Sequence, residues 1–240
     1  MMIPKSKGGG GELLTNKVDI VMTVIFLAAM LLVGIESKNM VMNSEASSGS
    51  YIVVLDVGHG GNDPGKVAGD VLEKDINLQI SMKVKEELEK QGIAVIMTRC
   101  EDVGLYSEED TNKKQADMKN RCELINSSNA NIMVSIHQNS YSDMSVKGAQ
   151  VFYYEGSEEG KSIAENIQES IKNTVDSNNT REAKANDSYY IMKNISIPGV
   201  IVECGFLTNI EEKMKLMDEK YQEEMAKAIV NGIVAYKNGE

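Results

Sequence analysis

The sequence predicts an α/β fold in which a mixed, largely parallel sheet is flanked by helices on both faces, preceded by one N-terminal transmembrane helix. Short apolar runs rich in β-branched residues alternate with longer segments of helical periodicity, which is typical of a largely parallel sheet. The first run, Ile52–Val57, breaks into the glycine-rich loop Gly58–Gly61. A separate long apolar run near the N-terminus predicts the membrane helix.

The first fifty residues divide into a tail, an apolar run and a linker. Residues 1–17 are polar and glycine-rich, and their three lysines predict a tail that stays in the cytoplasm. Residues 18–35 are almost wholly apolar and are long enough for a transmembrane signal anchor, which needs about 17–25 residues. A cleaved secretory signal and a hydrophobic core segment are the alternatives, but no small-x-small cleavage site follows closely.

We therefore expect a single-pass protein of the cell membrane. Residues 36–50 are a polar, serine-rich linker, and residues 51–238 are the catalytic domain. The lysines on the N-terminal side of the apolar run place this domain on the extracytoplasmic side, in the cell envelope.

The composition is that of an ordinary globular domain. The chain has 240 residues, of which 42% are hydrophobic and 25% charged, enough for one domain with a core. A formal net charge of -11 argues against nucleic acid as a partner. The three cysteines show no C-x-x-C spacing, so we expect small core residues rather than a disulfide framework.

The elements of the domain follow from apolar periodicity and from glycine or polar breaks. Strands are expected at residues 52–57, 93–98, 132–136, 149–154, 189–192 and 200–202. Helices are expected from Glu73 to before Gly92, and over residues 112–127, 162–175 and 218–236. Residues 176–187 are polar and are expected to form a loop.

Chemistry-bearing residues follow three of the expected strands. His59 and His137, the only histidines of the chain, and Glu203 each stand where a buried apolar run ends. Ligands of such sheets bind beyond the carboxyl ends of the strands, so these three side chains should lie together. Glu73 begins a helix, where a carboxylate commonly only complements the helix dipole.

Two imidazoles and one carboxylate are a sufficient set of protein ligands for a catalytic zinc ion, which keeps a further position open for water. Magnesium and calcium prefer shells made of oxygen alone. A second carboxylate is then needed as general base, and the buried Glu203 is the candidate for it. A carboxylate that merely hydrogen-bonds the following turn is the alternative interpretation of Glu203.

Several motifs occur in an order that resembles a known family. They are Leu55-Asp-x-Gly-His-Gly-Gly-x-Asp-Pro-Gly65, Glu73-Lys74 with Asn77-Leu78, Thr98-Arg99 with Asp102, Ser135-Ile-His-x-Asn139, and Pro198 through Glu203-x-Gly-Phe206 with Asn209. Together they span about residues 51–236 and resemble the zinc-dependent N-acetylmuramoyl-L-alanine amidases with a type-3 amidase domain. The resemblance implies a zinc amidase/carboxypeptidase-like fold.

The resemblance also implies roles for individual residues. The family's zinc ligands match His59, Glu73 and His137, and its catalytic glutamate matches Glu203. The implied reaction is hydrolysis of the peptidoglycan amide between N-acetylmuramic acid and the L-alanine of the stem peptide, with one zinc ion as cofactor. Arg99 is expected to hold a loop or the sheet edge rather than to touch substrate. Asn139 is expected to orient the loop after His137, with stabilisation of the oxyanion as the alternative.

The domain architecture points to a subtype within this family. A bare catalytic domain behind one membrane anchor resembles the membrane-anchored, germination-specific amidases of the spore cortex, whose action starts the formation of muramic-δ-lactam. The absence of wall-binding repeats suggests an activating partner protein as a hypothesis. Two alternatives remain: a catalytically silent member of the fold that binds peptidoglycan or protein, and a zinc peptidase that cuts within the stem peptide.

Overall fold

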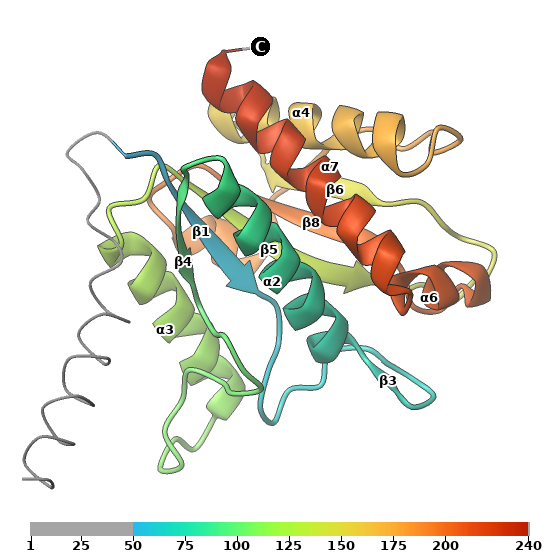
Figure 1. The fold of residues 1–240 in the computed structure, drawn as a ribbon. Coiled ribbons are helices and arrows are strands. Elements are labelled where there is room, and N and C mark those ends of the chain that lie inside the picture. Colours follow the sequence, from blue (N-terminus) through green and yellow to red (C-terminus); the bar gives the residue numbers. More distant parts are fainter. Residues whose placement is uncertain (1–49, 240) are drawn as a thin grey trace, which may run out of the picture. The chain divides into compact units, whose positions relative to one another are not determined.

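The structure of the chain is a computed structural model that describes residues 50–239. Six strands form its main sheet, in the order β4-β1-β5-β8-β6-β7 (Figure 1). These strands are β1 (Ile52–Val57), β4 (Ala94–Met97), β5 (Ile132–Asn139), β6 (Gln150–Tyr154), β7 (Lys184–Asn186) and β8 (Gly199–Phe206). A separate small hairpin is made by β2 (Val67–Ala68) and β3 (Val71–Leu72).

The sheet is mixed and largely parallel, as the sequence predicts. β1 runs parallel to both β4 and β5, and β5 runs parallel to β8. β6 pairs with β8 in the antiparallel direction, and β7 runs parallel to β6. Because β1, β5 and β8 have neighbours on both sides, their apolar, β-branched residues are buried almost without interruption.

Helices cover both faces of the sheet, which confirms the predicted layer order. The helices are α2 (Glu73–Lys90), α3 (Lys113–Ser127), α4 (Glu158–Thr174), α5 (Tyr190–Asn194), α6 (Ile210–Leu216) and α7 (Glu219–Asn238). Apolar residues of α2, α4 and α7 share one core cluster, and those of α3 and α5 share the other. Alternate strand residues supply each cluster, since successive side chains of a strand point to opposite faces.

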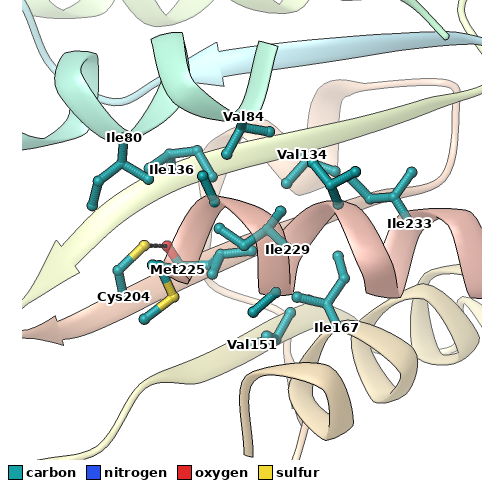
Figure 2. Packing of buried hydrophobic residues seen from close by; sticks show 14 of the residues in the cluster. Ile80, Val84, Val134, Ile136, Val151, Ile167, Cys204, Met225, Ile229 and Ile233 are labelled. Atoms are coloured by element: carbon teal, nitrogen blue, oxygen red, sulfur yellow. Dashed lines mark hydrogen bonds between the residues drawn. The ribbon is translucent and has the colours of Figure 1, made fainter. Parts of the chain in front are cut away.

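The larger core lies between the sheet and the three helices α2, α4 and α7. Figure 2 shows Ile229 of α7 among residues of the other elements, including Val134 of β5 and Ile167 of α4. The main chain of α4 also lies close to α7, because a Cβ on Gly232 would stand 2.5 Å from the Cα of Ile167. A side chain at this position would therefore push the two helices apart.

The sheet order places a topological switch point between β1 and β5. The connection from β1 to β4 passes through α2 on one face, and the connection from β4 to β5 passes through α3 on the other face. The connection that leaves β1 runs toward β4 and the one that leaves β5 runs toward β6, in opposite directions across the sheet, which makes the carboxyl ends of β1 and β5 a topological switch point. The first glycine-rich loop and the end of β5 meet there.

Some element predictions are wrong, and in each case tertiary packing determines the conformation of the segment. Residues 189–192 were expected to form a strand but begin α5, in which the consecutive residues Ile191 and Met192 are both buried. Neighbouring residues of a strand point to opposite faces, so the helix is the conformation that buries both on one side. The predicted loop over residues 176–187 contains β7, a short, mostly exposed edge strand.

One element end and one cysteine also differ from expectation. Helix α4 begins at Glu158, four residues before the predicted start, because the Ser157 hydroxyl caps it by accepting from the Gly160 amide. Cys122 and Cys204 are buried core residues as predicted, whereas Cys100 is exposed. The hairpin and α6 had no sequence prediction.

The predicted membrane anchor at residues 18–35 lies outside the described residues. Within residues 50–239, no helix is both long and apolar enough to cross a membrane.

Candidate metal centre and active site

Two histidines and a glutamate from three separate elements meet at the switch point. His59 lies in the loop after β1, Glu73 is the first residue of α2, and His137 lies in β5. Oε1 of Glu73 is 3.2 Å from Nε2 of His59 and 2.9 Å from Nδ1 of His137. One ligand atom from each residue lies within 4.8 Å of the others, a spacing that could hold a metal ion.

Two glycines make room for this group. A Cβ on Gly58 would stand 2.4 Å from the His137 ring, so any larger residue would displace that imidazole. Gly65 has φ +66°, and a Cβ there would stand 2.6 Å from both Oε2 of Glu73 and Cδ2 of His59. The glycine-rich composition of the loop is therefore required by the approach of the ligand side chains.

The backbone of His59 is held in an uncommon conformation by two arginines. His59 has φ 61°, a left-handed value that costs free energy in a residue other than glycine. Its carbonyl accepts hydrogen bonds from Nε of Arg99 and from one terminal nitrogen of Arg121, both at 2.7 Å. Arg99 donates as well to the carbonyls of Gly58 and Lys74. The prediction that Arg99 holds a loop is confirmed by these contacts.

Glu73 is fixed as an ionised carboxylate. Burial by itself would raise its pKa, but hydrogen bonds and charge from His137 and His59 outweigh burial and lower the pKa well below the usual value. The backbone amides of Lys66 and Gln138 donate to its two oxygens at 2.7 and 3.1 Å. The Asn77 amide, at 3.4 Å, adds a weaker donor. Glu73 therefore does more than complement the helix dipole.

Asp63 orients the His59 ring from the far side. Its Oδ2 lies 3.0 Å from Nδ1 of His59, while Nε2 on the other side of the ring faces Glu73. Burial raises the pKa of Asp63, but the contacts with His59 outweigh it and lower the pKa to about 2. The carboxylate is thus charged at neutral pH, as the donation from Nδ1 requires.

We expect Asp63→Asn to weaken metal binding by about 10–100-fold, the usual effect of losing such an outer partner. The physical reason is that the amide no longer holds the imidazole in one tautomer. Competition with a chromogenic zinc chelator measures the dissociation constant. Asp70→Asn, an exposed aspartate between β2 and β3, is the matched control. Equal zinc affinity for both variants would contradict the role given to Asp63.

Glu203 lies beside this group on the neighbouring strand. It is the β8 partner of His137 in the strand register, so it sits within β8 rather than at its end. Burial raises its pKa to about 7; the charges of His137 and His59 partly oppose this shift, and the charge of Glu73 adds to it. The Tyr189 hydroxyl lies 3.5 Å from Oε1, whereas Oε2 is buried without a hydrogen-bond partner among the described residues.

Sequence reasoning missed most of the supporting residues. Arg121 of α3 is almost fully buried and forms ion pairs with Asp56 and Asp117 at 2.9 and 2.6 Å. The i,i+4 spacing of Asp117 and Arg121 on a helix was a signal for their pair, but Asp56 is 65 residues away in the chain. Asn139, expected to orient the loop after His137, accepts at its own carbonyl from the Leu207 amide.

The fold and this group of residues define an α/β enzyme with a candidate metal centre. A family model described as N-acetylmuramoyl-L-alanine amidase matches residues 53–235. The chain is 40% identical over 188 residues to the germination-specific N-acetylmuramoyl-L-alanine amidase of Bacillus subtilis (strain 168), covering 77% of this chain and 79% of the relative.

Solved structures agree with this match. The CwlD amidase from Clostridioides difficile, in complex with the GerS lipoprotein, superposes with a TM-score of 0.78 and 43% identity, covering 80% of this chain and 100% of that one. An N-acetylmuramoyl-L-alanine amidase from Clostridium difficile 630 superposes with a TM-score of 0.71 and 33% identity, with the same coverage of both chains. The chain therefore belongs to the N-acetylmuramoyl-L-alanine amidase family of peptidoglycan hydrolases.

Proposed function

We propose that this protein is a zinc-dependent amidase that cleaves the bond between N-acetylmuramic acid and the L-alanine of the stem peptide during maturation of the spore cortex. The observation that carries the zinc proposal is the convergence of His59, Glu73 and His137. Two imidazole nitrogens and one carboxylate oxygen fit zinc better than magnesium or calcium. When bound, zinc supplies a Lewis acid and lowers the pKa of a water ligand to about 7.

In this proposal Glu203 moves the proton. Oε2 takes a proton from the attacking water and then gives it to the nitrogen of L-alanine as the amide bond breaks. A pKa of about 7 suits a group that must act first as base and then as acid near neutral pH. The Tyr189 hydroxyl near Oε1 favours Oε2 as the atom that exchanges the proton.

His137 and His59 have supporting roles that follow from their surroundings. Burial lowers the pKa of His137, but the hydrogen bond and charge of Glu73 outweigh burial and raise it. The two rings meet nearly edge to face, with their centroids 4.9 Å apart. The carboxylates of Glu73 and Asp63 hold these rings, so the ligand group is organised before any substrate arrives.

The experiment that tests the proposal combines metal removal with product analysis. Purified peptidoglycan is digested with the wild-type protein, with chelator-treated protein, and with the treated protein after zinc is restored. We expect intact stem peptides with a free L-alanine amine from the first and third digests only. Mass spectrometry that found the lactyl-alanine amide uncut and bonds within the stem broken would favour the peptidase alternative. Absence of any cleavage, with and without the proposed partner protein, would favour a silent, binding member of the fold.

The cortex role, the anchor and a partner belong to the same proposal. The cortex assignment rests on similarity to the germination-specific relative. Anchoring through residues 18–35 would keep the domain on the extracytoplasmic side, where peptidoglycan lies. The CwlD relative was solved with a lipoprotein, so we include an activating partner protein. Full turnover of cortex glycan by the purified chain alone would contradict that last part.

A further inference from the structure

The three arginines of the chain differ in how their charge is used. Arg99 donates to backbone carbonyls of the loop after β1 and the start of α2, and Arg121 pairs with two buried carboxylates. Arg181 is partly buried, yet within residues 50–239 no carboxylate lies within 4.0 Å of its guanidinium. Among the three arginines, its charge is therefore the one that neither a carboxylate nor a set of loop carbonyls at the metal centre takes up.

Arg181 is nevertheless held in one place. Its Nε donates to the Lys147 carbonyl at 2.8 Å, and one terminal nitrogen donates to Oε1 of Gln150 at 2.9 Å. The guanidinium also stacks over the Phe206 ring, 4.9 Å from its centroid. An arginine has five N–H donors, and two are used here, which leaves three for a ligand. An arginine that is fixed in this way loses little side-chain entropy when it binds an anion.

The position of Arg181 is tied to that of the proposed base. Gln150, which accepts from Arg181, is the β6 residue directly opposite Glu203 in the strand register. Side chains directly opposite each other in an antiparallel pair lie on the same face of the sheet. Phe206, beneath the guanidinium, ends the strand that carries Glu203. Arg181 is therefore held by a residue of β6, the strand next to β8, at the level of Glu203.

Arg181 lines a polar pocket of about 360 Å³ between the loops before β6 and after α4 and helix α6. The acidic side chains of this pocket are largely engaged elsewhere. Glu212 accepts from the backbone amides of Gly148 and Phe206, and Glu211 faces Lys147 at 3.9 Å. A second cation of the pocket, Lys215, forms no ion pair within the described part of the chain. Asp176, the third carboxylate of the pocket, accepts from the Asn178 amide at 3.0 Å. Three cations therefore face three carboxylates, and Arg181 and Lys215 are the two cations without an ion pair among residues 50–239.

We propose that Arg181 is a specificity-determining residue that binds a free carboxylate of the stem peptide, and this inference rests on the amidase function proposed above. The lactyl carboxyl of the muramic acid is part of the bond to be cut, so free carboxylates occur on the peptide side of that bond. A planar guanidinium with parallel donors matches a carboxylate, which it binds through two hydrogen bonds. Arg181 thereby holds the peptide while Glu203 acts on the amide.

The test compares two N-acetylmuramoyl tripeptides that differ only in whether the peptide carboxylates are free or amidated. The full-length protein, its Arg181→Gln variant and its Arg181→Lys variant are assayed on both. We expect Arg181→Gln to raise KM for the free-acid substrate by about 10–100-fold, the usual size of a lost hydrogen bond to a charged group, with little change in kcat. KM for the amidated substrate should not change.

Controls separate a lost contact from a disturbed fold. Arg181→Lys keeps the charge but not the paired donors, so its KM for the free-acid substrate should lie between the other two values. Lys227→Gln, an exposed cation of α7 without an ion pair among residues 50–239, should behave as wild type on both substrates. A rise in KM of equal size on both substrates, or a fall in kcat alone, would overturn the inference. Failure of the wild type to cleave either substrate even with the proposed partner protein present would overturn the proposed function itself.

Discussion

Glu203→Gln is expected to bind as much zinc as the wild type and to hydrolyse peptidoglycan about 10²–10⁴-fold more slowly, the usual contribution of a positioned general base. The glutamine has nearly the same shape but cannot take a proton from water. Its zinc should be retained because the proposed ligands are His59, Glu73 and His137. Elemental analysis of the purified protein and release of stem peptides measure the two quantities separately.

A matched change elsewhere controls for the loss of one negative charge. Glu165→Gln removes an exposed carboxylate of α4, where it pairs weakly with Lys161 at 4.0 Å, and should leave both quantities unchanged. Loss of zinc in Glu203→Gln would instead make Glu203 a ligand. Full activity of Glu203→Gln would show that the Glu203 carboxylate has only a structural role and that it is not the general base.

Arg121→Met is expected to lower the free energy of unfolding by about 3–5 kcal/mol, because it leaves buried carboxylates without their cation. Asp56 is 2% exposed and Arg121 also 2%, so water cannot replace the lost partner. The change also removes a donor to the His59 carbonyl, which helps to hold the left-handed backbone there. Urea denaturation measures the stability, and zinc affinity measured on the folded fraction reports on the loop.

The pH dependence of this variant gives a second check. Burial alone would raise the pKa of Asp56, but Arg121 and the Ser135 hydroxyl outweigh it and lower the pKa. A carboxylate whose pKa is lowered in the folded state stabilises the protein at pH values above its unfolded pKa of about 4. This stabilisation is lost as the pH falls further. Without Arg121, protonation of Asp56 becomes favourable in the folded state. The stability difference between wild type and variant should therefore shrink as the pH falls from 7 to 4.

Lys119→Met is the control for the Arg121 experiment. Lys119 lies on the same helix, is 68% exposed and pairs with Glu123 at 3.4 Å near solvent. Exposed pairs contribute about 0–1 kcal/mol, so this variant should unfold close to wild type at every pH. If Arg121→Met lowered the free energy of unfolding as little as Lys119→Met does, the buried network of Arg121 would not be what supports the loop after β1.

Local patterns in the sequence were sufficient for the layered α/β architecture and for three residues of the candidate site, His59, His137 and Glu203. Strands β1, β5 and β8 are apolar and β-branched over several consecutive residues, a pattern that neighbouring side chains alone specify. The histidines and Glu203 stand at or near the carboxyl ends of such runs, so the rule for ligand sites in parallel sheets was enough to bring them together. Glu73 was assigned through the resemblance to a family, since its position at a helix start has a simpler explanation.

Tertiary structure alone decided how the group is supported. Asp56 and Arg121 are 65 residues apart, and Arg181 meets Gln150 across 31 residues. The i,i+4 spacing signals only the pair of Asp117 and Arg121 within α3, and nothing in the local sequence points to Asp56 or Gln150 as partners of these arginines. Helix α5 gives a second example. Its short apolar run is compatible with a strand or a helix, and only the packing that buries the adjacent side chains of Ile191 and Met192 on one side selects the helix. Sequence periodicity indicates whether each face of a segment is buried or exposed. Pairing between distant side chains depends instead on where the sheet order places them. The strand register at the switch point was likewise determined only by packing.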